Sequence, residues 1–371
     1  MNIPDASRVA VIALLMIPVV GGILYLDSKK VSRDAVGGKV DVKTTANKEE
    51  KANIYTTAKE ITTPDGFINT GGMPVTIGEF VGKKVVLLDI WTYSCINCQR
   101  TTPYLNTWYG KYKDDGLVII GLHTPEFEFE KVYQNVVDAT KRLKIQYPVV
   151  LDNDYSTWTA YQNRFWPRKY LIDIDGFIVY DHIGEGGYEE TEAKIIELLN
   201  ERSARLGTDA VAKEKGTVSG VDATDFSKIK TPEMYFGATR VQYLANLPTS
   251  GCKDGVCNFT SSGNPALNTF ELSGAWKIND ENAVLESGEG AILIHFSANK
   301  VNLVASGLNG GVPADIYLDG EKIAEGQAGD AVENGTVVFD ASDLYNLVDL
   351  HGNYGEHILE IRFRTGGVSA F

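Results

Sequence analysis

Apolar segments with two different periods alternate along the first half of the chain. Val85–Ile90 and Leu117–Leu122 are almost continuous apolar runs, typical of strands buried on both faces of a sheet. The segments 95–112 and 128–144 follow these runs and predict helices. A third, short apolar run at Val149–Leu151 predicts another strand.

The next part of the chain predicts a hairpin and a closing helix. Lys169–Ile174 and Phe177–His182 flank Asp175-Gly176, a dipeptide that favours a tight hairpin turn. The segment Glu189–Leu206 places its apolar residues on one side of a helix. Strands that alternate with helices indicate an α/β domain, a mixed sheet covered by helices on both faces.

The last 140 residues have a different pattern. Apolar and polar residues alternate with a period of two, and Gly- and Asp-rich turns separate the segments. This pattern predicts an antiparallel all-β sandwich. The alternating apolar positions include Ile292, Ile294, Phe296, Leu359, Ile361 and Phe363.

The first thirty residues differ from both domains. Val9–Leu26 is a stretch of eighteen residues without a charge, close to the length of helix that crosses a bilayer. We expect an uncleaved membrane anchor, and a cleaved signal peptide is the alternative. More basic residues follow the segment than precede it, which by itself would place the body in the cytoplasm. The cysteine chemistry described below favours a body on the other side of the membrane, outside the cytoplasm.

Composition and charge narrow the function. The chain has 371 residues, of which 43% are hydrophobic, and a formal net charge of −14. This length suggests two domains, and the acidic balance argues against binding of nucleic acid. The predicted organisation is a membrane anchor at 1–30, a flexible tether at 31–59, an α/β domain at 60–206, a linker at 207–230 and a β domain at 231–371.

The candidate chemistry lies in the sequence Trp91-Thr-Tyr-Ser-Cys95-Ile-Asn-Cys98. Two cysteines three positions apart, after a buried strand and at the start of a helix, can form a disulfide across one helical turn. The unpaired N–H groups and partial positive charge of the helix N-terminus stabilise a thiolate. Cys95 is nearer that end, so we expect it to be the exposed nucleophile, with Cys98 buried and able to resolve a mixed disulfide.

Several residues around this motif resemble the thioredoxin superfamily. The resemblance implies a thioredoxin fold in which Asp89 is a buried acid that assists proton transfer to Cys98. Trp91 matches the tryptophan beside the active site, and Pro103 matches the proline that kinks the active-site helix. Trp166-Pro167 matches the cis-proline loop that faces the disulfide, which implies that the backbone beside Pro167 pairs with an extended substrate.

Longer segments resemble the TlpA-like, membrane-linked thioredoxins of the DipZ type. The segments are WTYSCINCQRTTPYL, GLHTPEFEFEK at 121–131, DHIGEGGYEETE at 181–192, and the region that begins at Thr231-Pro-Glu-Met-Tyr235. The resemblance implies that the β domain is a jelly roll similar to carbohydrate-binding modules. The multi-helix, CcdA-like membrane domain of the family has no counterpart in this sequence, so we expect a separate CcdA-like membrane electron donor.

Two other functions of the cysteines fit the sequence less well. A structural zinc site would need both cysteine pairs, but Cys98 and Cys252 are too far apart for the usual ligand spacing, so we predict no metal. A thiol peroxidase would carry a proline seven residues before its reactive cysteine, where this chain has Leu88. His123 and Glu126, in the loop after the second strand, are candidates to line the site and to move protons.

The β domain offers candidates for ligand binding. Exposed aromatic residues bind sugars in folds of this kind, and the candidates are Tyr235, Trp276, Tyr345 and Tyr354. A glycan or a partner protein is the candidate ligand, since fold resemblance alone does not decide between them. Cys252 and Cys257 flank a loop that contains Gly255, and we expect them to form a structural disulfide, which requires an oxidising compartment. The alternative is a second redox pair that exchanges electrons with Cys95 and Cys98.

The sequence therefore predicts a thiol–disulfide oxidoreductase that is tethered to a membrane and faces outward. Its cofactor is the Cys95–Cys98 disulfide itself. The Ile-Asn dipeptide between the cysteines lacks the histidine of strongly oxidising relatives, which favours reduction. The resemblance implies exported proteins, such as apocytochrome c, as substrates. The alternative is a surface binding protein with a redox-idle thioredoxin scaffold.

Overall fold

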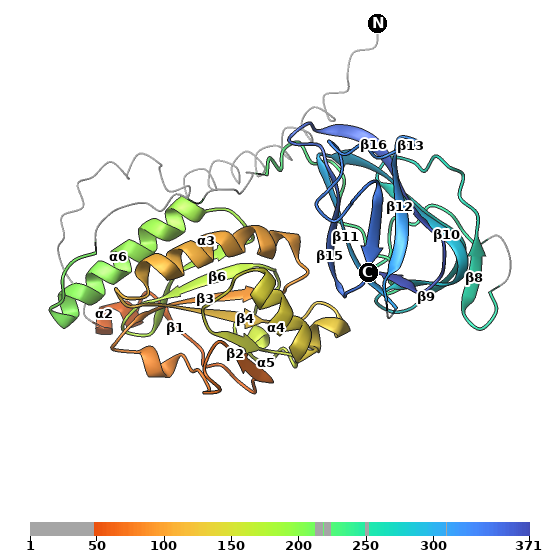
Figure 1. Ribbon diagram of the computed structural model, residues 1–371. Coiled ribbons are helices and arrows are strands. Elements are labelled where there is room, and N and C mark those ends of the chain that lie inside the picture. Colours follow the sequence, from red (N-terminus) through yellow and green to blue (C-terminus); the bar gives the residue numbers. More distant parts are fainter. Residues whose placement is uncertain (1–47, 212–217, 219–223, 249–251, 309) are drawn as a thin grey trace, which may run out of the picture. The chain divides into compact units, whose positions relative to one another are not determined.

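The structure is a computed structural model, shown in Figure 1, and it describes residues 48–211, 218, 224–248, 252–308 and 310–371. The residues from 47 to 371 form one compact unit. The predicted anchor at 1–30 and the larger part of the predicted tether lie outside the described residues. Within the described ranges, no helix is both long enough and apolar enough to cross a membrane.

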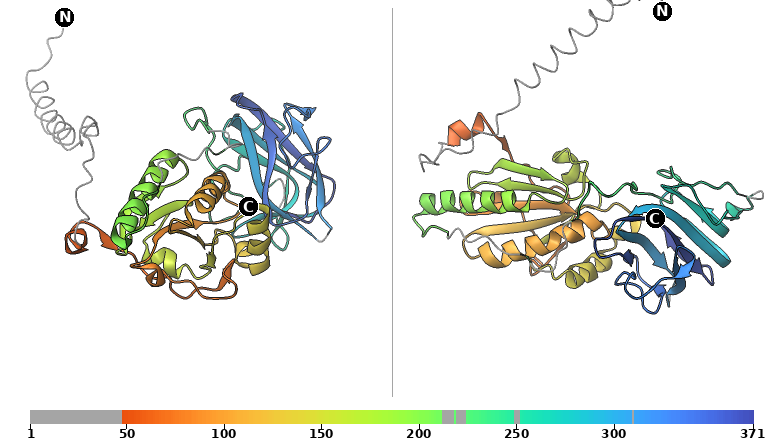
Figure 2. Two further views of the ribbon diagram at one scale, coloured as in Figure 1. Left: turned by 60° about the vertical axis from the view of Figure 1, so that its left-hand side comes forward. Right: turned by 90° about the horizontal axis from the view of Figure 1, so that it is seen from above.

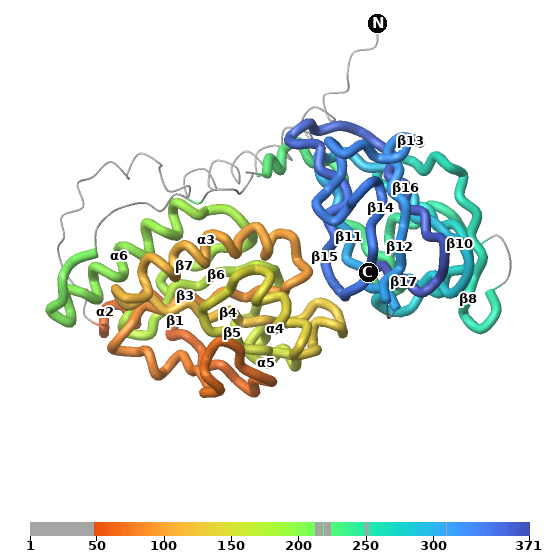
Figure 3. The backbone as a smooth tube through the Cα atoms, viewed as in Figure 1, coloured from red at the N-terminus to blue at the C-terminus, as the bar shows by residue number. Residues whose placement is uncertain are grey.

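The first domain is built on a seven-stranded mixed sheet with the order β1-β7-β6-β3-β4-β5-β2. The pairs β3–β4 and β4–β5 are parallel, and the remaining pairs are antiparallel. Its strands are β1 (Thr56–Thr57), β2 (Gly66–Ile68), β3 (Val85–Trp91), β4 (Leu117–His123), β5 (Val149–Leu151), β6 (Arg168–Ile172) and β7 (Phe177–Ile183). The tube of Figure 3 shows β3 in the interior of this sheet.

Helices and 3-10 turns surround the sheet. They are α2 (Lys48–Ala52), η2 (Gly78–Phe80), α3 (Ile96–Tyr112), η3 (Glu128–Lys131), α4 (Tyr133–Arg142), α5 (Ser156–Ala160) and α6 (Tyr188–Leu206). One hydrophobic core joins α3, α4 and α6 to residues of β3 and β4 such as Leu87 and Ile119. The other face of β3, including Leu88, packs in a second core with the segment that contains Ile61 and Ile77. Figure 2 shows α6 running along the sheet.

Two boundaries differ from the predictions. The segment 48–59 was predicted as tether, but α2 and β1 form there, because Lys51 is buried in an ion cluster and Thr56 pairs with Ile178 of β7. The helix predicted at 128–144 is divided into η3 and α4. Val132 adopts an extended backbone (φ −72°, ψ 112°), which interrupts the helical hydrogen bonds between them.

The second domain is a ten-stranded sheet whose strand pairs are antiparallel. The prediction that this domain is all-β is confirmed. The described strands, however, join in one sheet, because the long strand β10 pairs with β9, β16 and β17. The strands are β8 (Val256–Phe259), β9 (Thr269–Ile278), β10 (Ala283–Ala298), β11 (Lys300–Gly307), β12 (Val312–Leu318), β13 (Glu321–Lys322), β14 (Thr336–Phe339), β15 (Asp343–Asp349), β16 (Gly355–Phe363) and β17 (Val368–Ala370).

Candidate active site

The two cysteines of the CxxC motif lie at the start of α3, directly after β3. Cys95 is the N-cap residue of the helix, and its Sγ accepts a hydrogen bond from the Cys98 backbone N–H at 3.4 Å. Cys95 is half-buried and Cys98 is buried, with 2% of its surface exposed, and neither forms a disulfide in this structure. The geometry confirms the prediction of an accessible first cysteine and a buried second cysteine.

The environment of Cys98 keeps its thiol protonated. Burial raises the pKa of Cys98 well above its ordinary value, and the neighbouring Cys95 raises it further. A thiolate is the reactive form in disulfide exchange, so Cys98 needs a nearby group that accepts its proton before it can attack.

Asp89 interacts electrostatically with Cys98, and the resemblance to thioredoxins predicts that it accepts this proton. It lies on β3, is 2% exposed, and its Oδ1 has no hydrogen-bond partner among the described residues. Burial raises the pKa of Asp89 to about 7, although the positive charge of Lys169 lowers it. A carboxyl group with a pKa near neutrality can accept and return a proton at physiological pH.

Lys169 is a functional candidate that sequence reasoning missed. It stands directly opposite Asp89 in the antiparallel β3–β6 pair, and its ammonium group donates a hydrogen bond to the Gly184 carbonyl at 2.9 Å. The side chain is fully buried, and this burial lowers the pKa of Lys169, whereas Asp89 raises it. The sequence did contain a signal for Lys169. Residues 169 and 171 of a strand point to the same face, so Lys169 shares the buried face of Leu171, where a lysine is rare.

The predicted proline loop has the expected backbone shape. The Trp166–Pro167 peptide bond is cis, and Pro167 immediately precedes β6. The Trp166 indole N–H donates a hydrogen bond to the Thr124 carbonyl at 3.0 Å, and its ring packs on Trp158 with centroids 4.3 Å apart. These contacts fix Trp166 between the loop after β4 and α5.

Trp91 and His123 are buried in contact with each other, with 1% and 0% of their surfaces exposed. The indole of Trp91 passes close to Gly121, where a Cβ atom would come within 2.8 Å of its Nε1. The His123 ring packs edge-to-face on Trp91 and stacks on Tyr93. Burial lowers the pKa of His123 to about 3, so its imidazole is neutral at physiological pH. The prediction that His123 lines the site is therefore wrong, because its ring belongs to the core.

Glu130 is a second residue that sequence reasoning missed. Its buried carboxylate accepts hydrogen bonds from the Ser94 hydroxyl at 2.6 Å and from the Ser94 backbone N–H at 3.2 Å. It also accepts the backbone N–H groups of Glu126 and Phe127. Burial raises the pKa of Glu130, and these hydrogen bonds oppose that shift. Glu130 thus connects the residue before the nucleophile to the loop after β4.

Glu126 lines a cavity that also contains Cys95. Its carboxylate accepts hydrogen bonds from the guanidinium of Arg240 at 2.6 Å and from the hydroxyl of Tyr235 at 3.2 Å. The structure thus places Glu126 in the same cavity as Cys95, and its role in the reaction stays a prediction. Its partners come from the second domain, which no pattern in the sequence indicated.

The β-domain candidates separate into different roles. Trp276 is fully buried and Tyr345 is 9% exposed, so the prediction that they bind a ligand is wrong, because both belong to the core of the sheet. Tyr235 is engaged with Glu126, and the Tyr354 hydroxyl accepts a hydrogen bond from the Asp225 backbone N–H. Cys252 and Cys257 form the disulfide that their spacing predicted.

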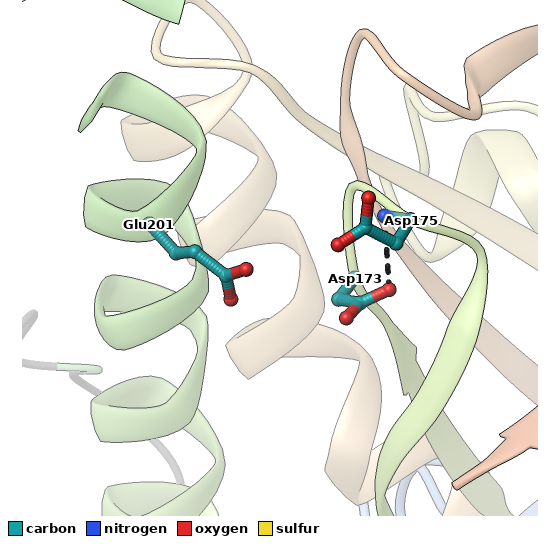
Figure 4. Close-up of side chains that lie close together, drawn as sticks. All are labelled: Asp173, Asp175 and Glu201. Atoms are coloured by element: carbon teal, nitrogen blue, oxygen red, sulfur yellow. Dashed lines mark hydrogen bonds between the residues drawn. The ribbon is translucent and has the colours of Figure 1, made fainter. Parts of the chain in front are cut away.

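One cluster of carboxylates resembles a metal site. Figure 4 shows Asp173 and Asp175 after β6, with the Glu201 carboxylate directed toward them from α6. The ammonium of Lys51 occupies the space between them, 2.6 Å from Asp173 and 2.9 Å from Asp175, and it also pairs with Glu201. Although burial alone lowers it, these three carboxylates raise the pKa of Lys51 above its ordinary value. The cluster therefore already has its cation, and it anchors α2 to the domain.

The fold and the site together define a thioredoxin-like redox protein. A family model described as Redoxin matches residues 56–199, and one described as thioredoxin like C-terminal domain matches residues 231–371. The thiol-disulfide oxidoreductase ResA of Bacillus cereus is 30% identical over 146 residues, which are 39% of this chain and 79% of ResA. The chain therefore belongs to the family of thiol–disulfide oxidoreductases.

A second group of relatives is similar over both domains. The DipZ proteins of Mycobacterium bovis and Mycobacterium tuberculosis are each 39% identical to this chain over 272 residues, which are 71% of this chain. The chain spans 38% of the length of these DipZ proteins. The resemblance to DipZ inferred from short motifs is thus confirmed.

Proposed function

We propose that this protein reduces disulfides in exported polypeptides, as a membrane-tethered oxidoreductase of the kind that acts in cytochrome c maturation. The observation that carries the proposal is the arrangement of Cys95, Cys98 and Asp89: an accessible sulfur at a helix N-terminus, a buried thiol beside it, and a buried carboxyl with a pKa of about 7. This arrangement supplies the nucleophile, the resolving thiol and the proton acceptor of a dithiol reductant.

The reaction has two exchange steps. The Cys95 thiol gives its proton to solvent, and the thiolate attacks one sulfur of the substrate disulfide, so that a mixed disulfide forms and the other substrate sulfur leaves as a thiolate that takes up a proton from solvent. Cys98 passes its proton to Asp89 and attacks Cys95, which releases the second substrate sulfur as a thiolate and leaves a Cys95–Cys98 disulfide. Asp89 then returns its proton to this thiolate. Two electrons and two protons pass from the protein dithiol to the substrate, which leaves as two thiols.

The direction of electron flow requires a donor. An oxidised Cys95–Cys98 pair has to be reduced again by a dithiol protein, and we assign this role to a separate CcdA-like membrane donor. The apolar segment Val9–Leu26 supplies the tether to the same membrane. The Cys252–Cys257 disulfide supports an oxidising compartment outside the cytoplasm.

Two alternatives make different demands on the site. A surface binding protein with an idle thioredoxin scaffold would not require a buried carboxyl near a resolving thiol. In addition, two of the four aromatic residues that are candidates for ligand binding belong to the core. A thiol peroxidase would react with hydrogen peroxide through Cys95. Asp89 and Lys169 stand opposite each other on β3 and β6, and both interact electrostatically with Cys98, which favours the dithiol reductant instead.

The proposal is tested by turnover of a disulfide-bonded polypeptide with dithiothreitol as the electron source. The wild-type protein should reduce the polypeptide catalytically, and a Cys98→Ser variant should stop at a stable mixed disulfide with Cys95. Failure of the wild-type protein to accelerate reduction would contradict the proposal. Rapid consumption of hydrogen peroxide with slow disulfide reduction would establish the peroxidase alternative.

A further inference from the structure

A cavity of about 930 Å³ lies beside Cys95 and takes its lining from both domains. The first domain contributes the start of α3, from Cys95 to Arg100, and the β domain contributes residues 231–236 and side chains of β11 and β15. We propose that the β domain forms one wall of the substrate site and binds the polypeptide chain that flanks the substrate disulfide. This inference rests on the proposed disulfide exchange at Cys95.

Arg240 is the main contact that holds this wall in place. Its guanidinium donates to the Glu126 carboxylate at 2.6 Å and lies 3.8 Å from the ring centroid of Tyr235 and 5.0 Å from that of Phe127. The Tyr235 hydroxyl reaches the same carboxylate. A planar cation that pairs with a carboxylate and stacks on aromatic rings gives a directional contact that a lysine does not reproduce.

Further contacts join the domains on the side of β15. The Arg142 guanidinium donates to Asp343 at 2.8 Å, and the Tyr93 hydroxyl donates to the Ser342 carbonyl at 3.0 Å. The Phe371 ring packs against Phe127 and Phe129, with centroid distances of 5.2 Å and 4.7 Å. Ion pairs, a hydrogen bond and an aromatic cluster thus fix the wall at several points.

The wall is connected to the nucleophile through hydrogen bonds. The backbone N–H groups of Glu126 and Phe127 donate to Glu130, which in turn accepts both donors of Ser94. Ser94 is the residue before Cys95. The loop that binds Arg240 therefore also positions Ser94, the residue before Cys95. This loop fixes the position of the wall relative to the Cys95 sulfur.

The chemistry of the cavity favours a polypeptide as its occupant. Its volume lies toward the upper end of the roughly 300–1,000 Å³ typical of ligand sites. Once a mixed disulfide forms on Cys95, the residues on each side of the substrate cysteine must lie next to this cavity. The wall presents the amide side chains of Asn302 and Asn346, which both donate and accept hydrogen bonds, beside the apolar side chain of Leu344. Phe226, in the segment just before the β domain, lines the same cavity.

The charges of the lining indicate which polypeptides bind best. Five carboxylates line the cavity, and three of them have a basic partner: Glu126 pairs with Arg240, Asp343 with Arg142, and Asp349 with Lys300. The remaining two carboxylates are Glu233 and Asp330. The acidic surplus favours basic residues beside the substrate cysteine and disfavours acidic ones. The occupant is therefore an extended polypeptide with neutral or basic residues around its disulfide.

The first experiment traps the complex. The full-length Cys98→Ser variant is reacted with a synthetic peptide that carries one disulfide flanked by lysines, and hydrogen exchange is compared with and without the peptide. We expect protection of residues 299–304 and 343–346 of the β domain as well as of the loop around Cys95. A mixed disulfide that protects the thioredoxin domain alone would overturn the inference, and so would protection of these strands by a soluble oligosaccharide but not by the peptide. Failure to form any mixed disulfide would contradict the proposed function itself.

The second experiment measures how much the cavity lining beside the β domain contributes to selectivity. Phe226 lines the cavity and is 57% exposed, so Phe226→Ala leaves the core intact. We expect the ratio of kcat/KM for the lysine-flanked peptide to kcat/KM for a small-molecule disulfide to fall roughly tenfold, the loss typical of one buried apolar contact in a binding site. The matched control is Leu247→Ala, an 83% exposed position outside the lining, which should leave the ratio unchanged. An unchanged ratio in Phe226→Ala would contradict the inference.

Discussion

The two cysteine pairs of this protein have opposite surroundings. Cys95 and Cys98 lie at the start of a helix that follows a buried strand. The carboxyl of Asp89 and the ammonium of Lys169 are buried in the same core. Cys252 and Cys257 close a short hairpin, in which Asp254 and Gly255 have φ angles of 54° and 84°. Both turn residues are left-handed, as the tightest hairpins require.

The difference shows that the surroundings, more than the cysteines, decide the chemistry. The first pair has a helix N-terminus that favours a thiolate and an acid that takes up the resolving proton. The second pair lies at a turn whose backbone already brings the chain together, since Lys253 and Val256 exchange two hydrogen bonds of 2.9 Å. We therefore expect the first pair to cycle between thiols and disulfide and the second pair to stay oxidised.

The largest expected effect is the difference in disulfide-reducing activity between variants of the two cysteine pairs. Cys95→Ser should abolish polypeptide disulfide reduction, because the nucleophile is lost. The double variant Cys252→Ser/Cys257→Ser should keep most of the activity, because its disulfide lies outside the lining of the cavity beside Cys95. Turnover of a disulfide-bonded polypeptide measures both. Equal losses in the two variants would remove the distinction between a redox pair and a structural pair.

The next effect concerns the proton acceptor behind Cys98. With a pKa of about 7, Asp89 ionises near neutrality, so the wild-type rate should rise as the pH passes through 7. Asp89→Asn should lose this rise and react about a hundredfold more slowly above pH 7, the scale of general base catalysis. Release of substrate from a preformed Cys95 mixed disulfide, measured from pH 5 to about pH 9, isolates the step in which Cys98 loses its proton, and a rise of this rate through pH 7 that persists in Asp89→Asn would contradict the assignment.

The same substitution has a calculable effect on stability. The carboxyl of Asp89 ionises near 3.8 in the unfolded chain and near 7 in the folded protein, so folding stability is lost as the pH rises between these values. A difference of about three pKa units corresponds to about 4 kcal/mol above pH 7. Urea unfolding of Asp89→Asn should therefore show a gain above pH 7, of up to this amount, that disappears near pH 4. A loss of stability at both pH values would contradict the pKa.

Removal of the second disulfide should have a smaller effect, on stability rather than on rate. The disulfide closes a loop with a sequence separation of five residues, and the entropy of so short a loop corresponds to about 2 kcal/mol. Thermal unfolding of Cys252→Ser/Cys257→Ser should reveal this loss. The same loss in wild-type protein treated with a reductant is the control, since it breaks the same bond without a substitution.

The smallest expected effect comes from the charge opposite Asp89. Lys169→Met removes the ammonium that lowers the pKa of Asp89, so the rise of the rate should move to higher pH. At pH 7 fewer molecules have an ionised Asp89, and the rate should fall by less than about tenfold. Lys141→Met, at an exposed position on α4, is the matched control. A shift toward lower pH in Lys169→Met would contradict this role.

The sequence predicted those features that depend on neighbouring residues. The apolar runs gave the positions of β3 and β4, and the CxxC spacing after β3 predicted the start of α3 at Cys95. The match of Trp166-Pro167 to a known loop predicted the cis peptide bond. Each of these depends on a local pattern that a single sequence contains.

The features that were missed depend on distant residues. Lys169 faces Asp89 only because strands 80 positions apart pair in one register. Lys51 is buried because Asp173, Asp175 and Glu201, which lie 122 to 150 positions later, surround its ammonium. The contact of Glu126 with Arg240 spans 114 positions and joins two domains. No local pattern contains the register or the docking that creates these contacts.

The reduction potential of the Cys95–Cys98 pair tests the central claim most directly. The protein carrying Cys252→Ser and Cys257→Ser is equilibrated with thiol–disulfide buffers, and the oxidised fraction of the remaining pair is measured. A reductant of exported polypeptides should show one two-electron transition near that of thioredoxin, at about −270 mV. A potential above about −180 mV would make the protein an oxidase or isomerase, and the absence of a reversible transition would contradict a redox function at this site.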